Sequence, residues 1–253
     1  MNIVSHEPLA RYTTFGIGGS AEYFISVENR EELLAALGEA QTRGISYWIL
    51  AGGSNVVCSD GEIPGLCIHV AHGTLDFAGT TVTADAGVSL ADLIEAALLH
   101  GYTGLETLSG IPGSVGGAIV GNAAAYGQTI SGPLLQVEIY EDGKTRWLSK
   151  DECGFSYRES LFKKNAWVLL RARFLLDVGN ETQLRSKSRE IIQLREKKYP
   201  PGIKCPGSYF KNLFLENIPE RTRVLIPENR DFYGKVPAWY FLNEIGARGM
   251  KQG

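Results

Sequence analysis

The spacing of hydrophobic and polar residues changes several times along the chain, between strand and helix periodicity. The first of these changes predict a small lobe. Residues 21–27 alternate apolar and polar side chains, as a strand with one buried face does. Residues 29–44 then begin at Asn29, a good helix N-cap, and repeat leucine at helical spacing. Residues 47–51 return to a short apolar run of strand type. This β-α-β pattern predicts a first lobe, which we assign to residues 1–60.

A second lobe is predicted for residues 61–179. Two short strand patterns, at 65–70 and 80–85, precede a helical pattern at 89–101. That helix starts at a serine, which can cap it, and stops at a glycine, which can end it.

The rest of the second lobe reads as strands. The dipeptide Asp142-Gly143 separates two alternating runs and is typical of a two-residue hairpin turn. A long apolar strand is predicted at 166–177. Because strands and helices follow one another without regular β-α-β alternation, the pattern favours an α+β fold over a doubly wound sheet.

The last part of the chain is more highly charged. Residues 180–201 predict a helix that ends at two prolines, and its interspersed acids and bases are typical of a solvated face. We take this helix as the start of a third domain at 180–253. A shorter apolar helix is expected at 238–242, ended by Gly246 and serving as core.

The composition limits the kinds of partner. The chain has 253 residues and a formal net charge of −3, so it offers no basic field for nucleic acid or an anionic membrane. Its four cysteines are widely spaced and no apolar leader is present, which fits a reducing compartment, so we expect a cytoplasmic protein. His69 and His72 form an HxxH pair without an evident third ligand, so we expect no metal site there.

The stretch from Thr107 to Val137 carries no charged residue and is long enough on count alone for a membrane span. Pro112 and Pro133 interrupt it, and glycines and side-chain amides dilute it, so it is no continuous apolar helix. We therefore expect no membrane span.

Three segments are rich in small residues: 16–21, 52–55 and 110–127. The first formally matches a dinucleotide-binding fingerprint, but a strand follows it where that fingerprint needs a helix. Glycine lets backbone N–H groups converge on a phosphate oxygen, so two such loops could clamp a pyrophosphate. Each loop taken alone is more typical of a tight turn or a close helix crossing, but three such segments in one chain of net negative charge favour anion binding.

Five blocks carry a family resemblance: YTTFGIGGSAEYF, AGGSN, SGIPGSVGGAIVGNAAAYG, GFSYRESLFK and PGSYFKN. In this order and at these spacings, the chain resembles the UDP-N-acetylenolpyruvoylglucosamine reductases, the flavoenzymes of peptidoglycan precursor synthesis. The resemblance implies an α+β fold in which a two-lobed FAD-binding domain of the vanillyl-alcohol oxidase (PCMH) type is followed by a substrate-binding domain.

The same resemblance implies a role for the small residues. In the family the glycine-rich blocks wrap the pyrophosphate of FAD and approach its ring system, where bulk would collide and anionic side chains would repel. It assigns to FAD the residues Gly52, Gly53, Ser54 and Asn55 of the first lobe, and Gly113, Ser114, Gly116 and Gly117 of the second.

Reducing an enolpyruvyl ether requires a hydride, stabilisation of negative charge that spreads into a carboxylate, and a proton. The resemblance implies that FAD supplies the hydride, with NADPH as co-substrate. It implies that Arg158 holds the substrate carboxylate and that Ser208 donates the proton with the help of neighbouring donors or water. It assigns further substrate contacts to Tyr126, Tyr157, Lys211 and Asn212.

Two features place the chain within the family. The short interval between Arg158 and Ser208 resembles the branch that lacks a substrate-covering tyrosine loop. The family continues beyond the part that matches residues 238–253 and carries a near-terminal glutamate that completes its active site. The sequence given ends before that glutamate, so we expect an incomplete third domain.

The sequence leaves three functions open. The first is a monomeric, NADPH-dependent reductase that converts UDP-N-acetylglucosamine enolpyruvate to UDP-N-acetylmuramate. The second is a catalytically impaired or non-catalytic FAD-binding protein of the same family. The third is a different FAD-linked oxidase of the same fold, against which the block at 206–212 argues.

Overall fold

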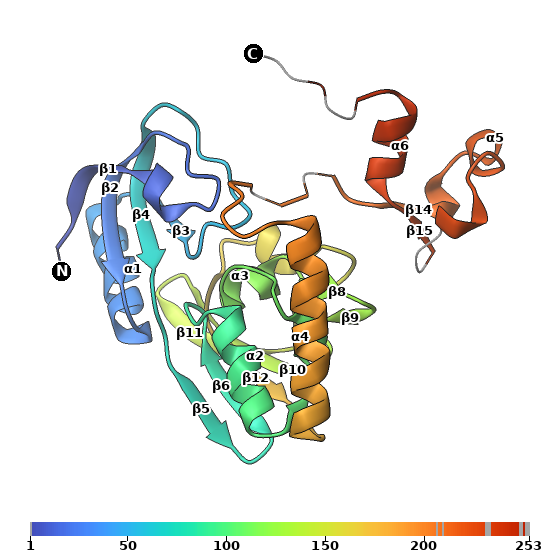
Figure 1. Cartoon of the computed structure of the whole chain (residues 1–253). Helices are drawn as coiled ribbons and strands as arrows, with labels where there is room; N and C mark the ends of the chain where they lie inside the picture. Colours follow the sequence, from blue (N-terminus) through green and yellow to red (C-terminus); the bar gives the residue numbers. More distant parts are fainter. Residues whose placement is uncertain (1, 206, 209, 231–233, 248–249, 251–253) are drawn as a thin grey trace. The chain divides into compact units, whose positions relative to one another are not determined.

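The computed structural model describes residues 2–205, 207–208, 210–230, 234–247 and 250. The chain forms two compact units, Met1–Pro206 and Gly207–Gly253 (Figure 1). The first unit holds both predicted lobes and the charged helix, and the second holds the C-terminal elements. Of the helices that the structure describes, none is long and apolar enough to cross a membrane.

The first lobe is built on a four-stranded sheet with the strand order β1-β2-β4-β3. The sheet includes a strand beyond residue 60, the predicted end of this lobe. Its strands are β1 (Val4–Pro8), β2 (Ser20–Val27), β3 (Tyr47–Leu50) and β4 (Ile63–Val70). β2 and β3 run parallel to β4, and β1 is antiparallel to β2. The helix α1 (Arg30–Arg43) connects β2 to β3 and packs on one face of this sheet (Figure 1). The predicted β-α-β order is confirmed.

The ends of α1 follow from local chemistry. Asn29 Oδ1 accepts a hydrogen bond from the backbone N–H of Glu32 at 2.9 Å. Gly44 ends the helix in the left-handed conformation, with a φ of 65°. The inner face of the helix buries Leu33 and Leu37 in the core of the lobe. The predicted cap and stop are therefore confirmed.

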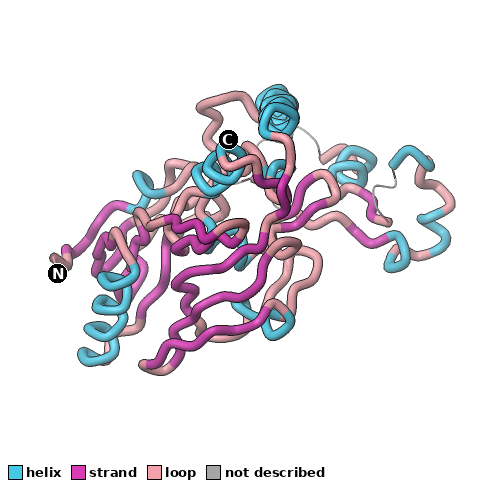
Figure 2. The backbone as a smooth tube through the Cα atoms, turned by 90° about the horizontal axis from the view of Figure 1, so that it is seen from below, coloured by secondary structure: helices cyan, strands magenta, loops and turns pink. Residues whose placement is uncertain are grey.

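The second lobe is built on a five-stranded antiparallel sheet with the order β11-β10-β12-β6-β5. Its strands are β5 (Leu75–Ala78), β6 (Thr81–Asp85), β10 (Leu134–Glu141), β11 (Lys144–Ser149) and β12 (Val168–Leu175). Figure 2 shows the strands of the first unit as neighbouring magenta tubes. β10 and β11 form the predicted hairpin.

The turn of that hairpin has the expected geometry. Asp142 and Gly143 both have positive φ angles, 47° and 82°. Such a turn matches the twist of the flanking strands. Two-residue strands complete the lobe and pair as β7 (Tyr102–Thr103) with β13 (Asp177–Val178), and β8 (Ala124–Ala125) with β9 (Gln128–Thr129).

Three helices gather on one face of the five-stranded sheet (Figure 1). They are α2 (Leu90–Leu99), α3 (Val115–Val120) and α4 (Glu181–Lys198). Together with the sheet they enclose the largest core cluster, in which Phe174 is completely buried. α3 lies inside the charge-free stretch, where the sequence analysis predicted no helix. Its residues, VGGAIV, have no helical hydrophobic period, so the pattern could not show it.

The charged helix α4 belongs to the first unit. Ser188 on the helix and Ser109 share a buried hydrogen bond of 2.8 Å, and Lys187 Nζ lies 3.1 Å from a carboxylate oxygen of the buried Glu106. The compact first unit therefore extends beyond residue 180, the predicted start of the third domain. The domain division itself stays a prediction.

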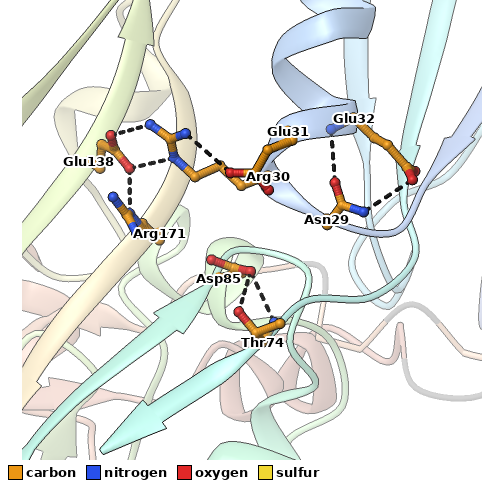
Figure 3. A network of polar contacts seen from close by, with 8 residues as sticks. All are labelled: Asn29, Arg30, Glu31, Glu32, Thr74, Asp85, Glu138 and Arg171. Atoms are coloured by element: carbon orange, nitrogen blue, oxygen red, sulfur yellow. Dashed lines mark hydrogen bonds and ion pairs between the residues drawn. The ribbon is translucent and has the colours of Figure 1, made fainter. Parts of the chain in front are cut away.

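A buried ion pair joins the two lobes. Glu138 of β10 is 5% exposed at its side chain and accepts hydrogen bonds from Arg30 of α1 and from Arg171 of β12 (Figure 3). Burial alone would raise the pKa of Glu138, but the two guanidinium donors outweigh it and lower the pKa. The carboxylate thus fixes α1 against the sheet of the second lobe.

The second unit contains little buried apolar surface among its described residues. Its strands β14 (Leu213–Phe214) and β15 (Lys235–Val236) pair antiparallel, and Ile218 and Val236 are buried. The short helices are α5 (Glu220–Arg223) and α6 (Ala238–Glu244). The helix predicted at 238–242 is confirmed, but its expected core role is wrong, because no residue of α6 is buried and Trp239 is 49% exposed.

Candidate active site

Two glycine-rich loops, one from each lobe, meet in the first unit. The loop at 52–55 follows β3, and the segment at 110–114 leads into α3. Ser54 Oγ donates a hydrogen bond to the carbonyl oxygen of Pro112 at 3.0 Å. A Cβ added to Gly52 would lie 3.2 Å from the Cα of Gly113, so the two backbones are in contact.

Close backbone packing explains several of these glycines. Gly53 and Gly113 have φ angles of +57° and +113°, which side-chain-bearing residues rarely adopt. A Cβ on Gly53 would lie 2.0 Å from the carbonyl oxygen of Tyr12, and one on Gly116 would lie 3.0 Å from the Cβ of Ala86. The protein itself fills the space that these side chains would need.

Gly117 differs from the other loop glycines. It lies in the first turns of α3, is exposed, and a Cβ there would touch only Ser114 Oγ, at the ordinary contact distance of 3.4 Å. Nothing in the described fold requires glycine at this position. The free space beside Gly117 fits a bound group that comes close to the backbone.

The loops also present unused hydrogen-bond donors. Within the described part of the chain, no group accepts a hydrogen bond from the backbone N–H of Gly53, Ser54, Asn55 or Ser114. Gly53 and Ser114 are buried, and buried N–H groups are nearly always paired in folded proteins. The donor set therefore fits an anion with several acceptor oxygens, such as the diphosphate of FAD.

The remaining small-residue segment, 16–21, and the residues just before it support the loop at 52–55. The N–H of Thr14 donates to the carbonyl oxygen of Gly53 at 3.2 Å, and the N–H of Gly19 donates to Ser59 at 2.7 Å. The side chain of Lys204 passes close to Gly16, and Cys205 accepts a hydrogen bond from Thr14 Oγ1. The end of the first unit therefore runs along this segment.

Arg158 sits in a tight turn on the second lobe. Ser156 and Glu159 exchange two backbone hydrogen bonds of 3.1 Å around it, and Arg158 itself has a φ of 58°. Its Nη2 donates to the carbonyl oxygen of Ala124 at 3.2 Å, and its guanidinium lies 6.0 Å from the centre of the Tyr157 ring. The predicted residues Arg158 and Tyr157 are thus held close to β8, the strand that directly precedes Tyr126.

Tyr126 lies in the tight turn between β8 and β9 and is 50% exposed. Its φ of 48° is unusual for an aromatic residue. The structure brings this predicted substrate residue near Arg158, which bonds to the carbonyl oxygen of Ala124 two residues before it. Tyr126 and Arg158 both act on the same half-buried cation, Arg195.

Arg195 is a further cation beside these residues, which the sequence analysis did not single out. Its Nε donates to the carbonyl oxygen of Gly110, at the start of the second glycine-rich stretch, at 2.9 Å. Burial lowers the pKa of Arg195, the hydroxyls of Tyr126 and Tyr199 act in the opposite direction, and the charge of Arg158 lowers the pKa further. An arginine keeps its proton in such surroundings, so two cations face one part of the second lobe.

A signal for Arg195 was present in the sequence. Leu184, Ser188 and Ile191 are the buried residues of α4 and repeat at helical spacing. Arg195 continues this inward stripe by one more turn. A charged residue on the inward face of a helix indicates a partner or a site, whereas the sequence analysis expects a solvated face for the charges of this helix.

Three predicted residues belong to the second unit. Ser208 and Lys211 are exposed, and Asn212 is half-buried. Asn212 Oδ1 accepts a hydrogen bond from the backbone N–H of Ala238, the first residue of α6, at 3.3 Å. The structure describes these three residues within their own unit, and their roles stay predictions.

His69 has a packing role in the first lobe. It hydrogen-bonds to Ser26 and lies against the rings of Tyr12 and Phe24. Burial lowers its pKa, and the nearby His72 lowers it further. Among the residues that the structure describes, no group of three acidic, histidine or cysteine side chains could hold a metal ion.

The comparisons with known proteins agree with this geometry. Residues 21–148 match the model of a family described as FAD binding domain. The UDP-N-acetylenolpyruvoylglucosamine reductase of Solibacter usitatus is 40% identical over 247 residues, which are 97% of this chain and 79% of the relative. The enzyme of the same name from Carboxydothermus hydrogenoformans is 35% identical over 254 residues, with 99% and 78% coverage.

A solved structure shares the fold over the whole chain. The crystal structure of UDP-N-acetylenolpyruvylglucosamine reductase (MurB) from Thermus caldophilus superposes with a TM-score of 0.77 at 30% sequence identity. The match covers 100% of this chain and 82% of that structure's chain. The predicted α+β fold with a PCMH-type FAD-binding domain is therefore confirmed.

Proposed function

This chain belongs to the UDP-N-acetylenolpyruvoylglucosamine reductases, FAD-dependent oxidoreductases of peptidoglycan precursor synthesis, and we propose that it reduces UDP-N-acetylglucosamine enolpyruvate to UDP-N-acetylmuramate with NADPH. The observation that carries this proposal is the meeting of two glycine-rich loops whose backbone donors have no acceptor among the described residues, in a chain 40% identical to a reductase of that name.

The loops from the two lobes hold FAD between them. Backbone N–H groups of residues 53–55 and of Ser114 bind the diphosphate oxygens, and the free space beside Gly117 admits the cofactor close to the backbone. Gly52, Gly113 and Gly116 allow the two loops to approach each other. Bound FAD supplies hydride transfer, which no amino-acid side chain provides.

Arg158 stabilises the negative charge that develops on the substrate. Its planar guanidinium forms two parallel hydrogen bonds with a carboxylate, and a pre-positioned donor of this kind stabilises charge that spreads from the enolate. Arg195 adds a second positive charge in the same region. Tyr126 and Tyr157 contact the substrate beside these two arginines.

The proposed reaction also needs a proton. Ser208 donates it to the enolate carbon, and Lys211 and Asn212 contact the substrate, Lys211 through a phosphate of the UDP moiety. The side-chain bond between Asn212 and the start of α6 supports this segment from within its own unit.

The compartment and assembly are also part of the proposal. Cys58, Cys67 and Cys153 are buried free thiols, which fits a reducing cytoplasm where NADPH is regenerated. We also expect a monomer.

The function is tested with the full chain, reconstituted with FAD. Anaerobic mixing with NADPH should bleach the flavin absorbance, and addition of UDP-N-acetylglucosamine enolpyruvate should restore it with formation of UDP-N-acetylmuramate, identified by mass spectrometry. A protein that binds FAD but shows neither step would contradict the proposed reaction. A protein that does not bind FAD would contradict the proposed cofactor site as well.

A further inference from the structure

Backbone strain is concentrated beside Arg158. Five described residues other than glycine have positive φ angles, and three of them, Asn122, Tyr126 and Arg158, lie in two neighbouring segments, with φ angles of 42°, 48° and 58°. Residues held in this conformation persist only where surrounding contacts fix them, and they are concentrated at functional sites. The contacts between these two segments therefore hold the backbone around Arg158.

Three side-chain bonds link segment 120–124 to segment 156–160. Asn122 Nδ2 donates to the carbonyl oxygen of Ser156 at 2.9 Å, and Ser160 Oγ donates to the carbonyl oxygen of Val120 at 2.8 Å. The third bond is that of Arg158 itself to Ala124, at 3.2 Å. Asn122 and Ser160 are 5% and 2% exposed, so both bonds are shielded from water.

Asn122 binds Ser156, the first residue of the turn. The carbonyl of Ser156 accepts from Asn122 and also from the N–H of Glu159, which closes the turn around Arg158. The amide of Asn122 thus fixes the Ser156–Tyr157 peptide, at the start of the turn that carries Arg158. Lys163 Nζ holds the other side by donating to the carbonyl oxygen of Arg158 at 2.6 Å.

Helix termination alone does not explain asparagine at this position. Asn122 follows α3 in a left-handed conformation that glycine adopts more readily. Its Oδ1 is buried and has no donor in the described part of the chain, which is unfavourable for the fold. Glycine would end the helix without burying that unpaired oxygen, so the contribution specific to asparagine is the bond to Ser156.

We propose that Asn122 is a positioning residue for Arg158, whose side-chain amide sets the Ser156–Glu159 turn and thereby the direction of the guanidinium. The proposal rests on the proposed function, in which Arg158 binds the substrate carboxylate. Asn122 does not touch the reacting atoms and acts through the turn. Its loss should impair the step that uses the carboxylate and spare the step that does not.

The test is Asn122→Gly, which keeps the left-handed backbone and removes only the side chain. We expect FAD affinity, flavin reduction by NADPH and the unfolding midpoint to stay near wild type. Reoxidation of the reduced flavin by the enolpyruvyl substrate should slow about 10- to 100-fold, because a misplaced binding group has effects of this size. Asp142→Gly, at another left-handed position in the β10–β11 turn, is the matched control and should leave both steps unchanged.

Hydrogen exchange gives a readout that needs neither substrate nor turnover. In Asn122→Gly, amides of the peptide 154–163 should exchange about tenfold faster than in wild type, since the turn loses its anchor. Unchanged exchange with wild-type reoxidation would overturn the proposal. Failure of the wild type to turn over would contradict the proposed function, whereas the exchange result would still report on the turn.

A second variant keeps the proposal testable if Asn122→Gly does not fold. Asn122→Asp keeps the shape and tolerance for left-handed φ but replaces the donating amide by an acceptor facing the Ser156 carbonyl. It should show the same selective loss of reoxidation. If both variants lose the fold or FAD, Asn122 is a structural residue and the positioning role is wrong.

Discussion

The hydroxyl of Ser54 donates a hydrogen bond to the carbonyl oxygen of Pro112 at 3.0 Å, joining a loop of the first lobe to a loop of the second. One hydrogen bond of this kind contributes only about 1 kcal/mol to stability. Its importance is geometric, because it marks the place where backbone donors from both lobes meet. A substitution in these loops can therefore change FAD affinity and fold stability independently of each other.

Gly117→Ala separates the two effects. The new methyl group meets only Ser114 Oγ at 3.4 Å, and alanine in a helix stabilises the fold by about 0.4–1 kcal/mol relative to glycine. We expect the FAD-free protein to unfold at a higher denaturant concentration, while FAD affinity, measured by flavin fluorescence titration, falls at least about tenfold, since 1.4 kcal/mol of repulsion suffices for that.

Gly38→Ala is the matched control for this substitution. Gly38 lies in α1, where an added Cβ meets nothing within 4 Å, so the same stabilisation should appear with unchanged FAD affinity. If Gly117→Ala bound FAD as tightly as wild type, the cofactor would not approach α3 at this residue.

Glu138→Gln tests the ion pair between the lobes. The change leaves Arg30 and Arg171 facing each other without a carboxylate, and removal of one partner from a buried ion pair costs about 3–5 kcal/mol. Because both arginines reach solvent, at 19% and 33% exposure, we expect the lower end, about 3 kcal/mol. Urea denaturation measures it, and Glu39→Gln, which breaks the exposed pair with Arg43, should change stability by less than about 1 kcal/mol.

The same pair predicts a pH dependence. The pKa of Glu138 is lowered in the folded protein from its ordinary value of 4.5, so the carboxylate stabilises the fold fully above that pH and progressively less as the pH falls below it. The glutamine variant does not titrate at this position. We therefore expect the difference in unfolding free energy between wild type and Glu138→Gln to shrink with acidification below about 4.5. A difference that stays constant across that range would contradict the assigned pairing.

Local signals were sufficient for much of the fold. Asn29, Ser89 and the Asp142-Gly143 turn predicted the limits of two helices and a hairpin, because caps and two-residue turns depend on neighbouring residues alone. β1 and α3 were missed for a related reason. The strand is mostly exposed and the helix consists of small residues, so neither has the periodic contrast that sequence patterns detect.

The site depended more on tertiary structure. Glycine spacing indicated that backbone would approach a ligand, but not that Gly52 and Gly113 would touch each other across two lobes. Hydrogen bonds from Asn122 to Ser156 and from Lys163 to Arg158 hold Arg158 in its left-handed conformation. Asn122 is distant from this turn in the sequence, and no sequence pattern distinguishes Lys163. The inward position of the half-buried Arg195 could have been inferred from the stripe of buried residues on α4, and the charged composition of that helix obscured it.

Arg158→Lys tests the substrate carboxylate contact. Lysine keeps the charge but offers no planar pair of donors, so the contact becomes a single point interaction. We expect flavin reduction by NADPH to be unchanged and kcat/KM for the enolpyruvyl substrate to fall about 100-fold, equivalent to about 2.7 kcal/mol of lost transition-state stabilisation. Arg189→Lys, an exposed position on α4, is the control and should behave as wild type. Equal loss in the NADPH half-reaction would place Arg158 elsewhere in the mechanism.

Ser208→Ala tests the proton donor in the second unit. The hydride arrives from NADPH through the flavin before any proton is needed, so the reductive half-reaction should proceed at nearly the wild-type rate. The oxidative half-reaction should produce no UDP-N-acetylmuramate, because the carbanionic carbon finds no acid at the right position. Stopped-flow absorbance separates the two halves, and Ser186→Ala, an exposed serine of α4, serves as control. If both half-reactions failed together, Ser208 would contribute to folding or cofactor binding; if product still formed, the proton would come from another group.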